Sequence, residues 1–213
     1  MTPPSGVGAH LCSGGSDDHP WRIGLAFGAL STELSYPGST PNGNLAESSI
    51  MGSASWTKGN LGIEIGLGAI LGGGISIQND VYAINPGGLA SIGASWRFLD
   101  GRGMAPFLIG DATLGASLTS TVRGSETPVS LFAADARVGA LVGKTFFDAI
   151  SPYLLARLFG GPILWARANG VATDAHHFQI GPGAAFHWSR LDATIEASVL
   201  GERMFVASIA YGL

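Results

Sequence analysis

The sequence predicts an all-β chain that forms a closed, antiparallel, up-and-down transmembrane β-barrel of about ten strands. Apolar and polar residues alternate with period two in about ten segments, which is the pattern of strands with one apolar and one polar face. Only 12% of the residues are charged, against about 25% in soluble domains. The sequence contains no run of 18 apolar residues, so a membrane-spanning helix is excluded and any crossing must use strands.

The chain begins with a segment unlike the rest. Residues 1–20 are rich in Pro, Gly, Ser and Asp and have no apolar period, which predicts an irregular leader ahead of a barrel formed by residues 21–213. The leader is either a flexible tail or a partial plug of the barrel mouth. It carries no secretory signal, so we expect the signal of an exported protein to be absent from this chain. Cys12 is the single cysteine and allows no internal disulfide.

In the first half of the chain, strands are expected at about residues 21–30, 48–58, 61–71, 89–98 and 106–116. The 89–98 segment shows the pattern most clearly, because Ala90, Ile92, Ala94, Trp96 and Phe98 share one face. Polar loops are expected at 31–47, 73–86 and 117–129, and tight turns at 58–60 and 99–104.

In the second half, strands are expected at about residues 131–143, 152–167 and 178–188, followed by a hairpin of 191–200 and 204–213. Gly160, Gly161 and Pro162 interrupt the 152–167 segment and predict a bulge or kink there. A loop is expected at 168–176. Eight or twelve strands are also compatible with these boundaries.

The connections alternate between long and short, which gives the predicted barrel two different ends. In membrane barrels the short turns lie on the periplasmic side and the longer loops outside. Five aromatic residues are expected at the short-turn end, where their rings would form an interfacial girdle: Trp21, Trp56, Trp96, Trp188 and Tyr211.

The charged residues of the strands fall on the face opposite the apolar one, so they are expected inside the barrel. The predicted interior network consists of Arg22, Glu64, Arg97, Asp111, Asp135, Arg137, Arg157, His187, Asp192 and Glu196. Asp111, Asp135, Arg137 and Arg157 lie on three consecutive strands and are expected to pair with one another. Such residues either fill the interior with ion pairs or line a narrow pore, and small inward residues such as Gly66 and Gly181 favour some open space.

Catalytic and cofactor patterns are weak in this sequence. Asp174, His176 and His177 share a predicted outer loop, where an acid and a histidine could activate water, and this is the basis of an alternative function as a rim hydrolase. His187, Ser189 and Glu196 superficially resemble a hydrolase triad, at the predicted periplasmic turn. No phosphate loop, spaced metal-ligand set or Lys/Arg run is present, so we expect no cofactor, no metal, no nucleic-acid partner and no enzymatic activity.

The last ten residues, MFVASIAYGL, carry a resemblance to a known family. Phe205, Ile209, Tyr211 and Leu213 alternate to the chain end, which resembles the C-terminal assembly signal of bacterial outer-membrane β-barrels, although that family most often ends in Phe. The chain is similar to small barrels of the OmpA/OmpW-like superfamily. The resemblance implies a bacterial outer-membrane location, and it implies three candidate partners: the lipid bilayer, the outer-membrane insertion machinery and a protein in the same membrane. It also implies a passive function, as a narrow pore or as a scaffold that binds a partner.

Overall fold

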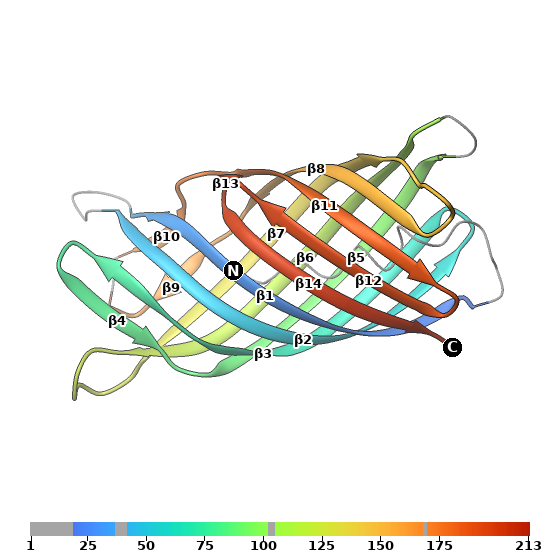
Figure 1. Ribbon diagram of the computed structural model, residues 1–213. Coiled ribbons are helices and arrows are strands. Elements are labelled where there is room, and N and C mark those ends of the chain that lie inside the picture. Colours follow the sequence, from blue (N-terminus) through green and yellow to red (C-terminus); the bar gives the residue numbers. More distant parts are fainter. Residues whose placement is uncertain (1–18, 37–41, 102–104, 168–169) are drawn as a thin grey trace.

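The chain forms one antiparallel β-sheet of 14 strands in a computed structural model, which describes residues 19–36, 42–101, 105–167 and 170–213 (Figure 1). The predicted leader and Cys12 lie in residues 1–18, outside the described ranges. No described residue belongs to a helix long and apolar enough to cross a membrane. The strands are β1 (Trp21–Ser35), β2 (Gly43–Lys58), β3 (Leu61–Ile77), β4 (Asp80–Ile84), β5 (Gly87–Asp100), β6 (Phe107–Val122), β7 (Val129–Gly143), β8 (Ile150–Gly160), β9 (Ile163–Trp165), β10 (Val171–Asp174), β11 (Phe178–Trp188), β12 (Leu191–Ser198), β13 (Leu200–Gly201) and β14 (Arg203–Gly212).

The sheet closes on itself. Strand β1 pairs with β2 along one side and with β14 along the other, so the first and last strands are neighbours. From β1 the antiparallel pairings run through β2, β3, β5, β6, β7, β8, β11, β12 and β14 and return to β1 (Figure 1). These strands follow one another in chain order, which is the arrangement of an up-and-down meander.

The 14 strands exceed the predicted number because four short ones, β4, β9, β10 and β13, have only two to five residues each. The predicted loops at 31–47, 73–86 and 168–176 were wrong in part, since β1 continues to Ser35, β2 already begins at Gly43, and β4 and β10 fall inside the other two. The break predicted at Gly160–Pro162 separates β8 from β9.

The strands continue beyond the predicted ends. Their side chains still alternate there, but the polar residues now face outward and the apolar residues face inward. Along β1, Ile23 and Leu25 face outward and are about half exposed, and Arg22 faces inward. Further along the same strand Ser31 and Glu33 take the outward positions, while Leu34 is completely buried inside. A search for outward apolar residues therefore ends the strand near residue 30, although the backbone ladder continues.

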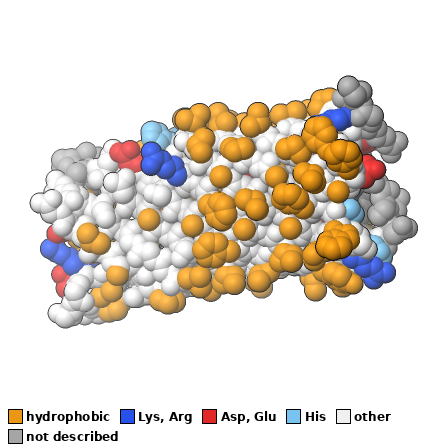
Figure 2. Space-filling model, viewed as in Figure 1, with side chains coloured by type: hydrophobic (Ala, Val, Ile, Leu, Met, Phe, Trp, Pro, Cys, Tyr) orange, Lys and Arg blue, Asp and Glu red, His pale blue; other side chains and the backbone are white. Residues whose placement is uncertain are grey.

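The closed sheet thus has two zones. In the zone that we call the apolar band, the outward side chains are hydrophobic, whereas in the outer extension, formed by the ends of β1, β2, β3, β6 and β7 together with β4, β9 and β10, they are mostly polar. Figure 2 shows hydrophobic side chains crowded over much of the outer surface and thinning towards the end where β4 and β10 lie. The short turns at 59–60 and 189–190 lie at the opposite end, which we call the turn end.

The interior of the outer extension is an apolar core. The side chains that form it come from β1, β2, β3, β4, β5, β7, β9, β10 and β14 and from Tyr36 just after β1: Leu30, Leu34, Tyr36, Leu45, Met51, Ile70, Ile75, Ile84, Leu89, Leu131, Ala133, Ile163, Trp165, Ala172, Met204 and Val206. The Trp165 ring meets Tyr82 edge-on with centroids 4.9 Å apart, and its indole N–H donates to the Thr121 hydroxyl at 2.8 Å. A smaller apolar cluster that includes Phe107, Leu141 and Leu155 lies nearer the turn end.

We predict that Leu34→Ala destabilises the protein by about 2–5 kcal/mol, because Leu34 is completely buried and its truncation leaves a cavity. Leu67→Ala is the control, since Leu67 is 74% exposed in the apolar band and the surrounding medium refills the space. The measurement is equilibrium urea unfolding in phospholipid vesicles, followed by tryptophan fluorescence. An equal loss in the two variants would contradict an apolar core at Leu34.

Candidate functional site: the polar interior of the apolar band

The interior of the apolar band holds most of the buried charged side chains, beside the apolar cluster that includes Leu141. Of the ten residues predicted to face inward, eight are buried: Arg22, Glu64, Asp111, Asp135, Arg137, Arg157, Asp192 and Glu196. Arg97 and His187 are half-buried near the turn end. Burial of this many charged groups is costly unless each finds an opposite charge or hydrogen-bond partners, so their pairing decides what this interior can do.

The first ion-pair network is centred on Arg157 of β8. Its guanidinium lies 2.5 Å from a Glu196 carboxylate oxygen on β12 and 3.3 Å from an Asp111 carboxylate oxygen on β6. The Tyr153 hydroxyl donates to Glu196 at 3.3 Å. The network therefore connects strands that are not adjacent, since β7 lies between β6 and β8, and β11 lies between β8 and β12.

Two glycines on the intervening strands make these contacts possible. Gly139 of β7 is in register with both Asp111 and Arg157, and a Cβ at position 139 would lie 2.3 Å from Cγ of Arg157. Gly183 of β11 is in the same position between Tyr153 and Glu196, directly beneath the tyrosine ring. A side chain can cross the middle strand only because glycine leaves its inner face bare.

The second network is centred on Arg137 of β7, which is almost completely buried. Its guanidinium contacts Asp135 at 2.5 Å and Glu202 at 2.7 Å, and it lies over the Phe159 ring at 4.9 Å from the centroid. The four residues predicted to pair together therefore divide between two networks, with Asp111 and Arg157 in one and Asp135 and Arg137 in the other.

Glu202 lies in the connection of the predicted hairpin 191–200 and 204–213 and was not among the predicted interior residues. Its side chain is completely buried beside Arg137. Val199 and Leu200 both point outward, so the alternation of β12 is interrupted there. Every second residue of β14 faces inward, as Met204 and Val206 do, and the same spacing carried back along the chain reaches position 202. This spacing was the sequence feature from which an inward Glu202 could have been predicted.

At the turn end, Asp192 contacts Arg22 at 2.8 Å and His187 at 2.5 Å. The resemblance of His187, Ser189 and Glu196 to a hydrolase triad was misleading, because Glu196 instead belongs to the Arg157 network. The strand alternation places His187 at the turn end and Glu196 four positions beyond Asp192 on the same strand.

The rim residues proposed for hydrolysis also do not assemble. Asp174 is buried and accepts a hydrogen bond from the Thr32 hydroxyl at 3.1 Å, whereas His176 and His177 are exposed. Asp174 belongs to β10 in the outer extension, where burial and then the charge of Glu202 raise its pKa to about 6. No hydrogen bond joins Asp174 to either histidine, and no metal-binding group of three His, Cys, Asp or Glu residues occurs within the described ranges.

The predicted girdle residues all lie at the turn end. Trp21 is in register with Trp56 on β2, Trp96 is in register with Leu61, and Tyr211 with Leu191. Trp188 is the most exposed of them, at 81%. The residues of the predicted assembly signal, Phe205, Ile209, Tyr211 and Leu213, all face outward and are about half exposed.

Solved structures with a similar fold are outer-membrane proteins. The translocator domain of the autotransporter NalP from Neisseria meningitidis has a TM-score of 0.51 at 13% identity, covering 96% of this chain and 93% of that chain. The transport unit of the autotransporter AIDA-I from Escherichia coli has a TM-score of 0.51 at 9% identity, covering 97% of both chains. The outer membrane protease OmpT from Escherichia coli has a TM-score of 0.52 at 8% identity, covering 93% of this chain and 98% of that chain.

These similarities confirm the predicted β-barrel, of the kind found in outer-membrane proteins, as a fold. No protein-family model matches the chain, and no curated protein matches it in sequence. The narrower likeness to the OmpA/OmpW-like superfamily stays a prediction. Because the similar structures include both translocators and a protease, the fold alone does not select an activity.

We predict that Arg137→Leu destabilises the folded protein by about 3–5 kcal/mol, because it leaves Asp135 and Glu202 buried without their cation. Arg123→Leu is the matched control. Arg123 pairs with Asp80 where both side chains are more than 40% exposed, and its guanidinium lies 5.9 Å from the Tyr82 ring centroid. At such exposure the ion pair contributes about 0–1 kcal/mol and the cation–π contact about 0.5–1 kcal/mol. Urea unfolding of the two variants in lipid vesicles measures the difference, and equal stability would refute a buried Arg137 network.

We also predict that Gly139→Ala costs about 1–3 kcal/mol through overpacking, because the new methyl group would displace Arg157 from Asp111. Gly88→Ala tests whether the effect is specific, since a Cβ at position 88 on β5 would have no neighbour within 4 Å. The same unfolding measurement applies to both. A Gly139→Ala variant as stable as Gly88→Ala would show that Arg157 does not cross β7.

Proposed function

We propose that this protein is a bacterial outer-membrane β-barrel of ten principal strands, whose interior is closed and whose function is to serve as a passive scaffold. The main support is the polarity of the two faces in the apolar band. Hydrophobic side chains face outward and paired charges face inward, the reverse of a soluble β-protein. Hydrocarbon outside the ring explains why hydrophobic side chains face outward and why charged side chains face inward.

The height of the apolar band fits a bilayer. On β1, the outward residues remain apolar from Trp21 through Ile23, Leu25 and Phe27 to Ala29, before Ser31 and Glu33 follow. That is nine residues, counted from 21 to 29, and a tilted membrane strand needs about 9–11. The turn end would then lie in the periplasm and the outer extension above the membrane, in agreement with the predicted sidedness.

A closed interior agrees better with the side-chain contacts than a pore does. Arg157 reaches a carboxylate on a strand that is not its neighbour, and Arg137 reaches Glu202 in the connection before β14, so both side chains extend into the space that an ion would cross. The apolar core of the outer extension would add a second barrier. Small barrels are commonly filled by their own side chains.

The outer extension supports a scaffold that meets a partner outside the cell. Strands β2 and β3 have 16 and 17 residues, several more than a bilayer requires, so the surplus would stand in water. Tyr82 on β4 links this region together, because Arg123 and Arg167 both lie over its ring. A rim hydrolase is less favoured because Asp174 faces the core and not the two histidines.

We predict that the full chain, refolded into a planar lipid bilayer, gives no steady conductance steps. Insertion is verified on the same sample by protease protection of the strands. Silence from inserted protein is the expected result for a filled interior. Steady steps would overturn the closed scaffold in favour of a narrow pore, and the Arg137→Leu variant would then be tested for larger steps.

We further predict that the outer extension is accessible from outside intact cells. In a Cys12→Ser background, Ser125→Cys in the exposed β6–β7 connection should react with a membrane-impermeant maleimide, and Asn60→Cys in the exposed β2–β3 turn should react only after the outer membrane is broken. The reverse pattern would contradict the proposed orientation. Labelling of both positions in intact cells would contradict a membrane crossing between them.

A further inference from the structure

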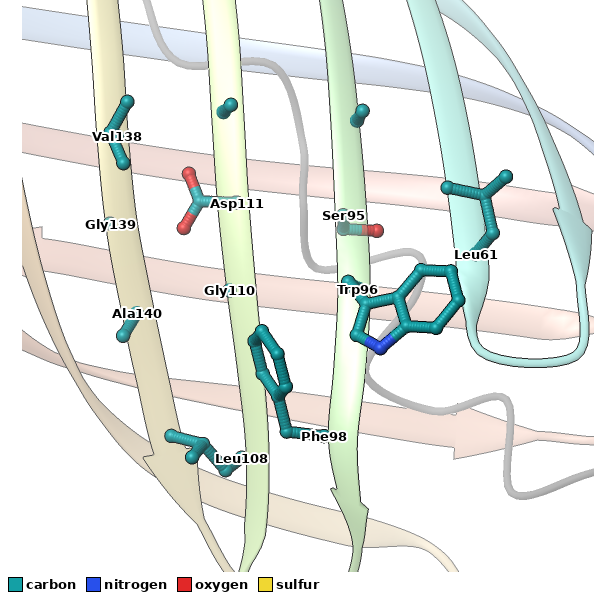
Figure 3. Close-up of a pocket in the computed structure, with 12 residues that line it drawn as sticks. Leu61, Ser95, Trp96, Phe98, Leu108, Gly110, Asp111, Val138, Gly139 and Ala140 are labelled. Atoms are coloured by element: carbon teal, nitrogen blue, oxygen red, sulfur yellow. The ribbon is translucent and has the colours of Figure 1, made fainter.

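An open groove lies on the outer face of the sheet, in the apolar band near the turn end. It has a volume of about 440 Å³ and crosses β3, β5, β6 and β7 (Figure 3). Its floor is low because Gly110 and Ala112 on β6 and Ala94 and Ala140 on the flanking strands carry little or no side chain. Trp96 and Phe98 of β5 stand on one side, and Val138 of β7 on the other (Figure 3).

An irregularity in β5 shapes this groove. The register between β5 and β6 shifts between Arg97 and Leu99, so Phe98 and Leu99 both point outward. The Phe98 ring lies against Gly110, where an added Cβ would be 2.9 Å from its Cε2 atom. The groove is therefore bounded by an aromatic ring on a backbone bulge, not only by a row of small residues.

A positive charge is held at the foot of the groove. Lys144 follows the last residue of β7, and its ammonium donates to the carbonyl oxygen of Ala105 at 3.0 Å, just before the start of β6. Leu108 of the groove wall is in register with Val142, two positions before Lys144. Asp100, exposed at the end of β5, is in register with Phe107 on the other side of the β6 start, so the foot of the groove carries an acidic as well as a basic side chain.

We propose that the groove is a binding site for one phospholipid, with an acyl chain over Ala94, Ala112 and Ala140 and the headgroup phosphate against Lys144. This site rests on the proposed function, which surrounds the apolar band with a bilayer. The groove lining offers hydrocarbon contacts, while the lysine at its turn end offers the opposite charge to a phosphate. A phospholipid has both features at the required ends, whereas a purely apolar solute would make no use of Lys144.

The test counts lipids bound to the detergent-solubilised full chain by native mass spectrometry, during titration with phosphatidylglycerol. The wild-type chain should bind one molecule more tightly than all further ones. Ala112→Leu, which fills the groove floor, should weaken that first binding at least tenfold. Ala207→Leu, an outward alanine on β14 at the other side of the ring, should leave it unchanged.

Lys144→Gln separates the headgroup contact from the acyl contact and should weaken the first binding severalfold, whereas Lys58→Gln at the same end should not. Unchanged binding in Ala112→Leu, or equal losses in Ala112→Leu and Ala207→Leu, would overturn the site. Failure of the proposed function is distinguishable, because a chain that does not insert into vesicles fails before any lipid is counted. A chain that inserts but shows no preferred first lipid refutes the groove site alone.

Discussion

Backbone hydrogen bonding is the constraint on which this structure depends. Inside hydrocarbon, each unpaired N–H or C=O group costs several kcal/mol, so a sheet can cross a membrane only if it has no edge there. The pairing of β1 with β14 satisfies this condition across ten residue pairs, from Arg22 with Gly212 to Ser31 with Arg203. Once the ring is closed, each strand has one face inside and one outside, and the medium outside then determines which residues each face accepts.

That medium changes along the strands, and the side chains change with it. Where Leu25 and Phe27 face outward, the interior holds charges such as Arg157 and Glu196 that satisfy one another. Where Glu33 and Asn44 face outward, the interior holds Leu34 and Ile75. The same hydrogen-bonded strands therefore have a charged interior in the apolar band and an apolar interior in the outer extension. They join the two zones because they are long enough to run through both.

The alternation in the sequence was sufficient to predict the apolar band, because one face there is continuously hydrophobic and the charges share the other face. It placed Arg22, Asp111, Asp135 and Arg137 on the side where the structure buries them. It did not predict the outer extension, because the strands were identified by their outward apolar residues, and the outward residues of β1 become polar near residue 30. Glu202 was missed because a change of phase at Val199 and Leu200 hides its position, and no sequence pattern indicates that Gly139 and Gly183 allow contacts between strands that are not adjacent.

The contacts across Gly139 and Gly183 also bear on how the strands find the correct partners. If β8 slipped by one residue against β7, its two faces would exchange, and Arg157 would point into lipid at a cost of about 2–4 kcal/mol near the midplane. The slip would at the same time separate Arg157 from both carboxylates and set its side chain opposite a residue with a Cβ. A misaligned β8 would therefore place a charge in lipid, lose both ion pairs and crowd the Arg157 side chain. The buried charges thus favour the correct strand register during folding, whatever they contribute to the stability of the finished barrel.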